Sequence, residues 1–145
     1  MDELVRWLGE QLDEDELWVR EAKKDGGDCW NLLAFERGDG AIYDDSGNQV
    51  LTYNTDPATG LPELLDNPLG ARQAAFIAAH DPARVLRETD AKRRLVERYE
   101  RAWENRRAHP DDLASAGAFL ALHDAVKLLA LPYADRPGYR DDWRP

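Results

Sequence analysis

The sequence predicts an α+β fold of four helices, with a small antiparallel β-hairpin or three-stranded sheet inserted after the first helix. Apolar residues recur at helical spacing in four stretches, at about 2–24, 67–80, 81–107 and 113–131. Between the first two stretches, residues 30–53 alternate short β-type runs with glycine-containing turns. Because a lone hairpin is only marginally stable in water, we expect it to pack on a helix.

The first helix is predicted over residues 2–24, with one apolar stripe and one acidic face. Residues 13–16 lie on the acidic side, and the segment 25–28 ends the helix with two glycines, which can adopt the left-handed cap conformation. The stripe consists of Leu4, Val5, Leu8, Leu12, Val19 and Ala22. This pattern predicts a helix that buries one side.

The β region follows in residues 30–53. Trp30 begins an alternating run, Gly38-Asp39-Gly40 is a turn signal, and the runs 41–43 and 49–53 flank the loop 44–48. The sequence Asp-Asp-Ser-Gly-Asn of that loop is typical of a hairpin connection.

Three helices are predicted in the second half, after the loop-like residues 56–68. Asn67 is a candidate cap with Pro68 at the first helical position, opening a helix that runs to His80 and buries Phe76 and Ile77. Asp81-Pro82 repeats this pattern and opens a longer helix to about residue 107. Its apolar stripe consists of Val85, Leu86, Leu95, Val96, Tyr99 and Trp103. Residues 109–112 interrupt the helical pattern, and the last helix is predicted at about 113–131.

The last residues, LLALPYADRPGYRDDWRP, are unusually rich in aromatics for a chain terminus. Termini that are not anchored are usually polar. Tyr133, Tyr139 and Trp143 therefore predict a tail that packs on the helices. We expect a single domain over residues 1–145, in which 1–66 form the acidic helix and hairpin and 67–145 the helical part with its packed tail.

Composition describes a globular protein with an uneven charge distribution. The chain is 43% apolar and 33% charged, with a net charge of −10. Residues 1–66 hold 17 acids and 5 bases, whereas residues 67–145 hold 12 acids and 14 bases. The single cysteine, Cys29, excludes an internal disulfide. The acidic N-terminus is unlike a signal peptide and no long apolar run stands out, so we expect a cytoplasmic protein without a membrane partner.

Two long motifs carry a family resemblance. IAAHDPARVLRETDAKRRLV at 77–96 and LLALPYADRPGYRDDWRP at 128–145, together with the acidic first helix and the AIYDDSGNQV hairpin, resemble an uncharacterised family of small proteins from actinomycetes and their phages. The resemblance covers most of the chain. It implies a source and a shared fold but no activity, because this family is known only as a domain of unknown function.

Two alternative functions have sequence support. His80-Asp81 and His123-Asp124, with His109, Asp111 and Asp112 to complete a cluster, would suit a metal-dependent phosphohydrolase if the three histidine side chains converge. The acids between residues 10 and 28 would suit a DNA mimic that inhibits a nucleic-acid enzyme, although Arg20, Lys23 and Lys24 interrupt them. Binding of nucleic acid itself is disfavoured by the net charge of −10.

The function expected from the sequence is a non-enzymatic accessory protein that binds another protein, without metal or cofactor. A dimer is also expected, in which the first helix of one copy meets residues 84–107 of the other through opposite charges. The candidate interaction residues are Trp7, Trp18, Asp13, Glu14, Arg87, Arg94 and Arg98.

Overall fold

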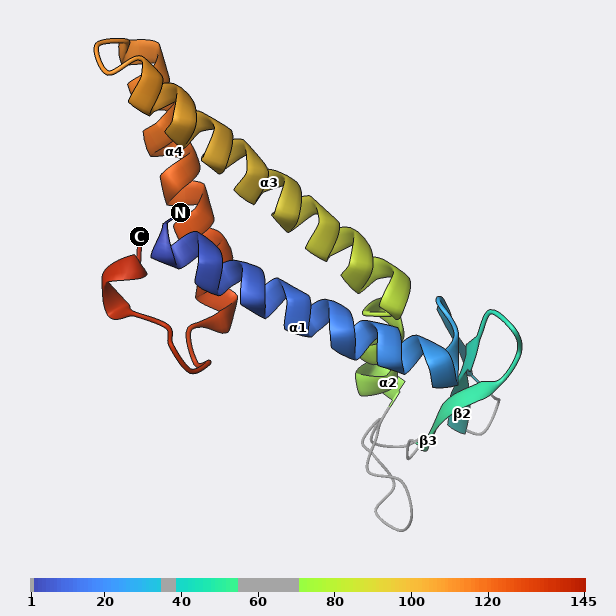
Figure 1. The fold of residues 1–145 in the computed structure, drawn as a ribbon. Coiled ribbons are helices and arrows are strands. Elements are labelled where there is room, and N and C mark those ends of the chain that lie inside the picture. The colour runs from blue at the N-terminus through green and yellow to red at the C-terminus, as the bar shows by residue number, and fades with distance from the viewer. Residues whose placement is uncertain (1, 35–38, 55–70) are drawn as a thin grey trace. The chain divides into compact units, whose positions relative to one another are not determined.

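The computed structural model describes residues 2–34, 39–54 and 71–145, and it confirms the predicted α+β fold (Figure 1). Four helices and a three-stranded sheet appear in the predicted order. Asn67, Pro68 and the loop 56–66 lie outside the described residues. The elements are α1 (Glu3–Gly26), β1 (Trp30–Ala34), β2 (Asp39–Asp44), β3 (Gln49–Asn54), α2 (Ala71–Ala79), α3 (Pro82–Ala108), α4 (Leu113–Ala130) and the short 3₁₀ turns η1 (Leu131–Tyr133) and η2 (Asp141–Trp143).

The chain forms two compact units, each with its own apolar core. Unit 1 consists of Met1–Asp15 and Glu88–Pro145, and unit 2 consists of Glu16–Arg87. The divisions fall inside α1 and α3, so both helices contribute residues to both units. Whether the whole chain behaves as one domain stays a prediction.

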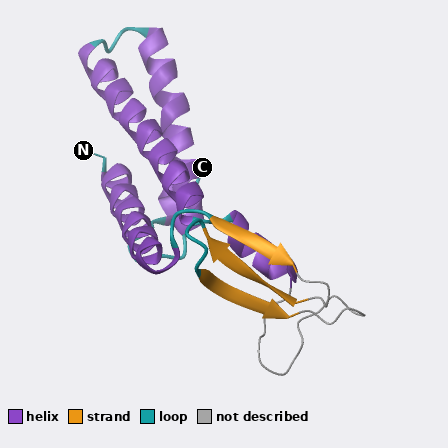
Figure 2. Cartoon of the chain, turned by 90° about the vertical axis from the view of Figure 1, so that its right-hand side faces the viewer, coloured by secondary structure: helices purple, strands orange, loops and turns teal. Residues whose placement is uncertain are grey.

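Unit 2 is built around the antiparallel sheet, with strand order β1-β2-β3. Trp30 pairs with Asp44 across the first two strands, and Ile42 pairs with Leu51 across the second two. Figure 2 shows α2 packed beside the strands, and the core that joins them contains Ile42, Ala74 and Ala78. The hairpin therefore packs on a helix, as its marginal intrinsic stability requires.

Asp44 organises the tight turn that joins β2 to β3. Its Oδ1 accepts hydrogen bonds from the backbone N–H of Ser46 at 2.9 Å and of Asn48 at 2.7 Å, and its Oδ2 accepts one from the Asn48 side chain at 2.9 Å. These bonds, led by that from the Asn48 side chain, lower the pKa of the Asp44 carboxyl. Gly47 takes a φ of 83°, which an L side chain rarely adopts. The predicted hairpin loop is thus confirmed.

The expected burial of Phe76 is wrong, because its side chain is 66% exposed. Ala74 and Ala78 supply the buried contacts of α2. Phe76 is two residues from each of them, about 200° around the helix, and therefore lies on the other side. Its ring instead contacts that of His80, with 4.2 Å between centroids.

Unit 1 buries the apolar stripe at the start of α1 against α3, α4 and the tail. Asp112 begins α4 by accepting hydrogen bonds from the backbone N–H groups of Ala114 and Ser115 at 3.1 Å each, and the Asn105 amide donates to the Ser115 hydroxyl at 3.1 Å. The core consists of Leu4, Val5, Trp7, Leu8, Leu12, Tyr99, Val126, Ala130, Tyr133 and Trp143.

The tail prediction is confirmed, since Tyr133 and Trp143 are buried and Tyr139 is half-buried. The Trp7 ring lies 5.5 Å from Tyr139 and 5.4 Å from Trp143, and its Nε1 donates to the backbone oxygen of Pro137 at 3.0 Å. Gly138 has a φ of 85°, and a Cβ there would lie 3.0 Å from that same Nε1. Glycine thus permits both the turn and the close approach.

We predict that Trp143→Ala lowers the free energy of unfolding by about 3–5 kcal/mol, because it leaves a cavity beside Trp7 and Tyr139. Urea denaturation followed by circular dichroism measures the loss. The matched control is Trp18→Ala, which truncates a tryptophan that is 66% exposed and should change stability by no more than about 0.5 kcal/mol. Equal losses in the two variants would contradict a packed tail.

Candidate functional site

The histidines required by the phosphohydrolase hypothesis make separate local contacts. The Nδ1–H of His80 donates to the Phe76 carbonyl at 2.8 Å, and that of His109 donates to the Asn105 carbonyl at 3.2 Å. His123 instead packs on the ring of Phe119, with 5.8 Å between centroids. Among the residues that the structure describes, no group of three or more His, Cys, Asp or Glu side chains is placed to hold a metal ion.

Two of the aspartates in the proposed His-Asp cluster, Asp81 and Asp112, act as helix caps. Asp81 accepts a hydrogen bond from the backbone N–H of Arg84 at 2.7 Å at the start of α3, as the Asp-Pro pattern predicted. Asp112 caps α4 in the same way. These contacts give both carboxylates a structural role.

The predicted charged interaction residues are largely engaged within the chain. In unit 1, Asp13 pairs with Arg93 at 2.5 Å and Glu14 pairs with Arg136 at 3.2 Å. Arg94 pairs with Asp90, one turn earlier in α3, at 2.8 Å. Attraction between the acidic start of α1 and basic side chains of the second half thus operates inside one copy. Arg87 and Arg98 are exposed.

The two predicted tryptophans have opposite environments. Trp7 belongs to the core of unit 1, so its assignment to an interaction surface is corrected: the C-terminal tail covers it. Trp18 is 66% exposed, in unit 2. Sequence periodicity places both near the α1 stripe, but it cannot indicate which part of that stripe the tail covers.

Trp18 borders an open cavity of about 220 Å³ within unit 2. Trp18 and Ala22 come from successive turns of α1, Trp30 comes from β1, and Pro82 comes from the start of α3. The remaining lining residues are Val19, His80 and Val85. The lining is almost entirely apolar and suits an aliphatic, aromatic or proline side chain rather than a charged group.

Two polar contacts fix the segments that form this cavity. The backbone N–H of Ala83 donates to the Asp28 carbonyl at 2.9 Å, which holds the start of α3 beside the residues that precede β1. Lys23 forms an ion pair with the Asp28 carboxylate at 2.5 Å, which joins α1 to the same residues. We call the surface formed by Trp18, Trp30, Phe76, His80 and Pro82 the Trp18 surface.

The sequence pattern did not indicate most of the Trp18 surface. It predicted Phe76 in the core and suggested His80 as a metal ligand. The Phe76 ring is exposed and contacts His80, and it also borders a shallow apolar cavity with Arg72, Gln73 and Ile77. The alanines at positions 74 and 78 were the available signal, because they define a buried stripe that excludes position 76.

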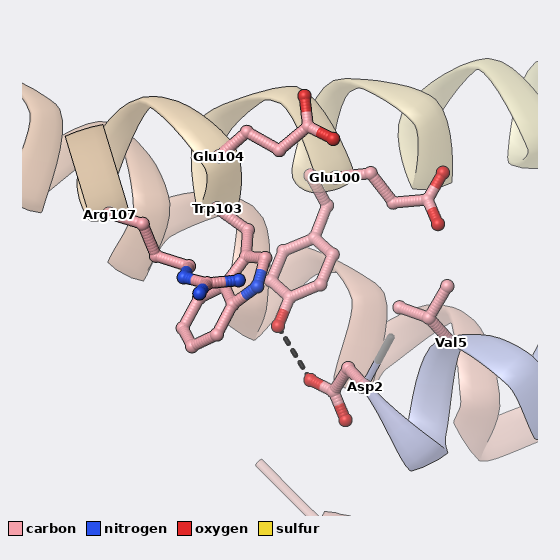
Figure 3. Close-up of a pocket in the computed structure, with 7 residues that line it drawn as sticks. Asp2, Val5, Glu100, Trp103, Glu104 and Arg107 are labelled. Atoms are coloured by element: carbon pink, nitrogen blue, oxygen red, sulfur yellow. Dashed lines mark hydrogen bonds between the residues drawn. The ribbon is translucent and has the colours of Figure 1, made fainter.

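A second cavity, of about 280 Å³, lies in unit 1 between the start of α1 and the second half of α3 (Figure 3). Tyr99 donates a hydrogen bond to the Asp2 carboxylate at 2.6 Å. Besides Asp2 and Tyr99, the cavity is lined by Val5, Glu100, Trp103, Glu104 and Arg107. Three carboxylates and one guanidinium give this cavity a negative balance.

Two tyrosine hydroxyls near α1 are held in the neutral form. Burial, followed by the hydrogen bond to Asp2, raises the pKa of Tyr99 well above its usual range. Burial, followed by a 2.6 Å hydrogen bond to Asp15, does the same to the pKa of Tyr133. Lys92 donates to the Tyr133 hydroxyl at 2.9 Å, so this oxygen is both donor and acceptor. The arrangement supports structure rather than proton transfer at neutral pH.

Comparison with known proteins assigns the whole chain to a protein family. Residues 1–145 match the model of a family of unknown function, DUF6221. The chain belongs to this family. No curated protein and no solved structure matches it. The resemblance inferred from the 77–96 and 128–145 motifs is therefore confirmed at the level of a family of unknown function, which leaves the biochemical role to be argued from the surfaces of this chain.

We predict that stability falls at alkaline pH as tyrosines ionise. An unfolded tyrosine titrates near pH 10, and the folded pKa values of Tyr99 and Tyr133 are raised above it. Their contribution is therefore fully present below about pH 10 and is lost as the pH rises towards the folded pKa. Urea unfolding at a series of pH values should show a shallower decline for the double variant Tyr99→Phe/Tyr133→Phe. Parallel curves for variant and wild type would contradict the assignment.

Proposed function

We propose that this protein is a non-enzymatic accessory protein that binds another protein through the Trp18 surface. One observation carries the proposal: Trp18 is 66% exposed at the edge of an apolar cavity formed by α1, β1 and α3. Large exposed aromatics next to an apolar pocket are typical of interface centres, where truncating one tryptophan costs about 2 kcal/mol or more of binding energy.

The composition of the surface supports a binding role over a catalytic one. Apart from His80, the residues that line the cavity have apolar side chains, and the Nδ1–H of His80 is already engaged with the Phe76 carbonyl. Such a surface provides buried area and shape but no general base beside a nucleophile. A protein side chain is therefore the ligand class that fits it best.

The DNA-mimic alternative loses support from the ion pairs of α1. Asp13 pairs with Arg93, and Glu14 and Asp15 pair with Arg136. Further along the helix, the pairs are Glu16 with Arg20, Glu21 with Lys24 and Asp28 with Lys23. A mimic needs a row of uncompensated negative charge, and neighbouring bases interrupt it here.

The proposed setting is the cytoplasm of an actinomycete or of a cell infected by one of its phages. The support is the resemblance of residues 77–96 and 128–145 to small proteins of those sources. The net charge of −10 favours a protein partner over nucleic acid or an anionic membrane surface.

We predict that Trp18→Ala abolishes capture of the physiological partner. Full-length wild type, Trp18→Ala and Arg101→Ala would be immobilised, exposed to extract of the source organism and compared by quantitative mass spectrometry. Arg101→Ala is the control, because it truncates a side chain in unit 1 that is 73% exposed and belongs to neither apolar surface. The partner should be retained by wild type and by the control, and calorimetry with the purified partner should show at least about 30-fold weaker binding to Trp18→Ala.

The contrary result would be equally clear. Partners captured in equal amounts by wild type and Trp18→Ala, but lost by the control, would move the binding surface out of unit 2. Because Trp18 is exposed, the variant keeps its fold, which circular dichroism would verify before each comparison.

A further inference from the structure

The exposed side of α4, in unit 1, is apolar along the whole helix. At 100° per residue its exposed residues share one face about 160° wide. They are Leu113, Ala114, Gly117, Ala118, Leu120, Ala121, Asp124 and Leu128. Leu113 is 87% exposed and Leu120 is 60% exposed, and Asp124 is the one charged residue among the eight. A helix face turned to water ordinarily carries several polar and charged residues, so this face has the composition of an interface.

The spacing of this face fits a second copy of the same helix. We infer that α4 packs antiparallel against α4 of another copy, about a two-fold axis that passes between Leu120 and Ala121. In that register Leu113 lies opposite Leu128, Leu120 lies opposite Ala121, and Gly117 lies opposite Asp124, in each case across the two copies. Each large side chain then meets either another leucine or a small residue, which is the self-complementarity that a two-fold interface requires.

Charge selects the antiparallel arrangement over the parallel one. In a parallel pair in register, the two Asp124 carboxylates would face each other and repel. In the antiparallel pair they are seven residues apart along the axis, about 10 Å, which is comparable with the screening length in physiological salt. Each carboxylate instead faces Gly117 of the other copy, which has no side chain to pack against it.

A membrane is the other candidate for an apolar helix of this length. Leu113–Tyr133 is, by length and composition alone, apolar enough to span one. However, Asp124 is near the middle of this span, where hydrocarbon offers its charge no partner and imposes a large cost. The net charge of −10 also opposes binding to an anionic lipid surface. A second copy covers the same apolar face without placing the Asp124 carboxylate in lipid hydrocarbon.

The size of the contact indicates a weak dimer. From Leu113 to Leu128 the face is about 22 Å long, and a helix is about 10 Å wide, so its footprint is near 220 Å². Standard interfaces bury about 800 Å² on each partner. We therefore expect only weak association, so the mass would be measured by analytical ultracentrifugation from about 10 µM to about 500 µM.

The first test compares two matched charge insertions in the full chain. Leu120→Glu should weaken dimerisation at least about tenfold, because a further carboxylate from each copy then enters the contact beside those of Asp124. Leu17→Glu, at a side chain that is 58% exposed in unit 2, should leave it unchanged. Wild type that stays monomeric at the highest concentration would overturn the inference, as would a dimer that only Leu17→Glu disrupts. Monomeric protein that floats with phosphatidylglycerol vesicles, and loses this binding in Leu120→Glu, would favour the membrane instead.

The second test reads the register directly, in a Cys29→Ser background that removes the exposed native thiol. At helix separations of 8–10 Å, facing Cα atoms lie about 3.5–5.5 Å apart, within the range of a disulfide. A mixture of Gly117→Cys and Asp124→Cys chains should therefore cross-link on mild oxidation. Either variant alone places its two cysteines about 10 Å apart and should not. If each variant alone cross-links, and the mixture gives no more cross-linked product than the single variants, the helices pair in parallel and the assignment is overturned.

Because this inference concerns α4 and the proposed partner binds the Trp18 surface, the two fail separately. Partner capture by Trp18→Ala tests the Trp18 surface alone, whatever the oligomeric state of Leu120→Glu. A monomeric wild type would overturn the α4 dimer but would not contradict partner binding at the Trp18 surface.

Discussion

The Trp7 ring is the contact on which the organisation of unit 1 depends. It belongs to the apolar stripe of α1, yet Tyr139 and Trp143 of the C-terminal tail pack on it, and its Nε1 donates to the Pro137 carbonyl. A segment 130 residues away in the sequence therefore completes the core begun by the first helix. Such long-range aromatic contacts contribute both buried area and preferred ring geometry, so the tail is as much a core element as any helix.

A polar cluster around the Tyr133 hydroxyl connects α1, α3 and the tail, and it brings acids of the first half of the chain beside bases of the second half. The Tyr133 hydroxyl donates to Asp15 and accepts from Lys92, while the Arg136 guanidinium lies 4.7 Å from the Tyr133 ring centroid and pairs with Asp15 at 2.7 Å. Acids of the first half thus meet bases of the second half within unit 1. Because these charges are partly buried and hydrogen-bonded, they determine geometry more than a fully exposed pair would.

The two units present different exposed apolar surfaces. In unit 2, the Trp18 surface combines a cavity with aromatic side chains from three elements. In unit 1, the exposed face of α4 is a helical strip of leucines and small residues with a single charged residue, Asp124. An aromatic cavity suits a protruding side chain of a partner, whereas a straight apolar strip suits another helix. The difference in shape is the physical reason for assigning the two surfaces to different partners.

Sequence determined the local structure of this protein, and tertiary contacts decided which apolar residues became surface. Capping at Asp81, the turn at Asp44 and the helical periodicity of α1 depend on residues within a few positions, so they were predictable. The aromatic content of the tail also predicted its packing. Phe76 and Trp7 were misassigned because burial depends on which segments cover a helix face, and those segments lie far away in the sequence. Periodicity identifies an apolar face, but only the folded chain shows what covers it.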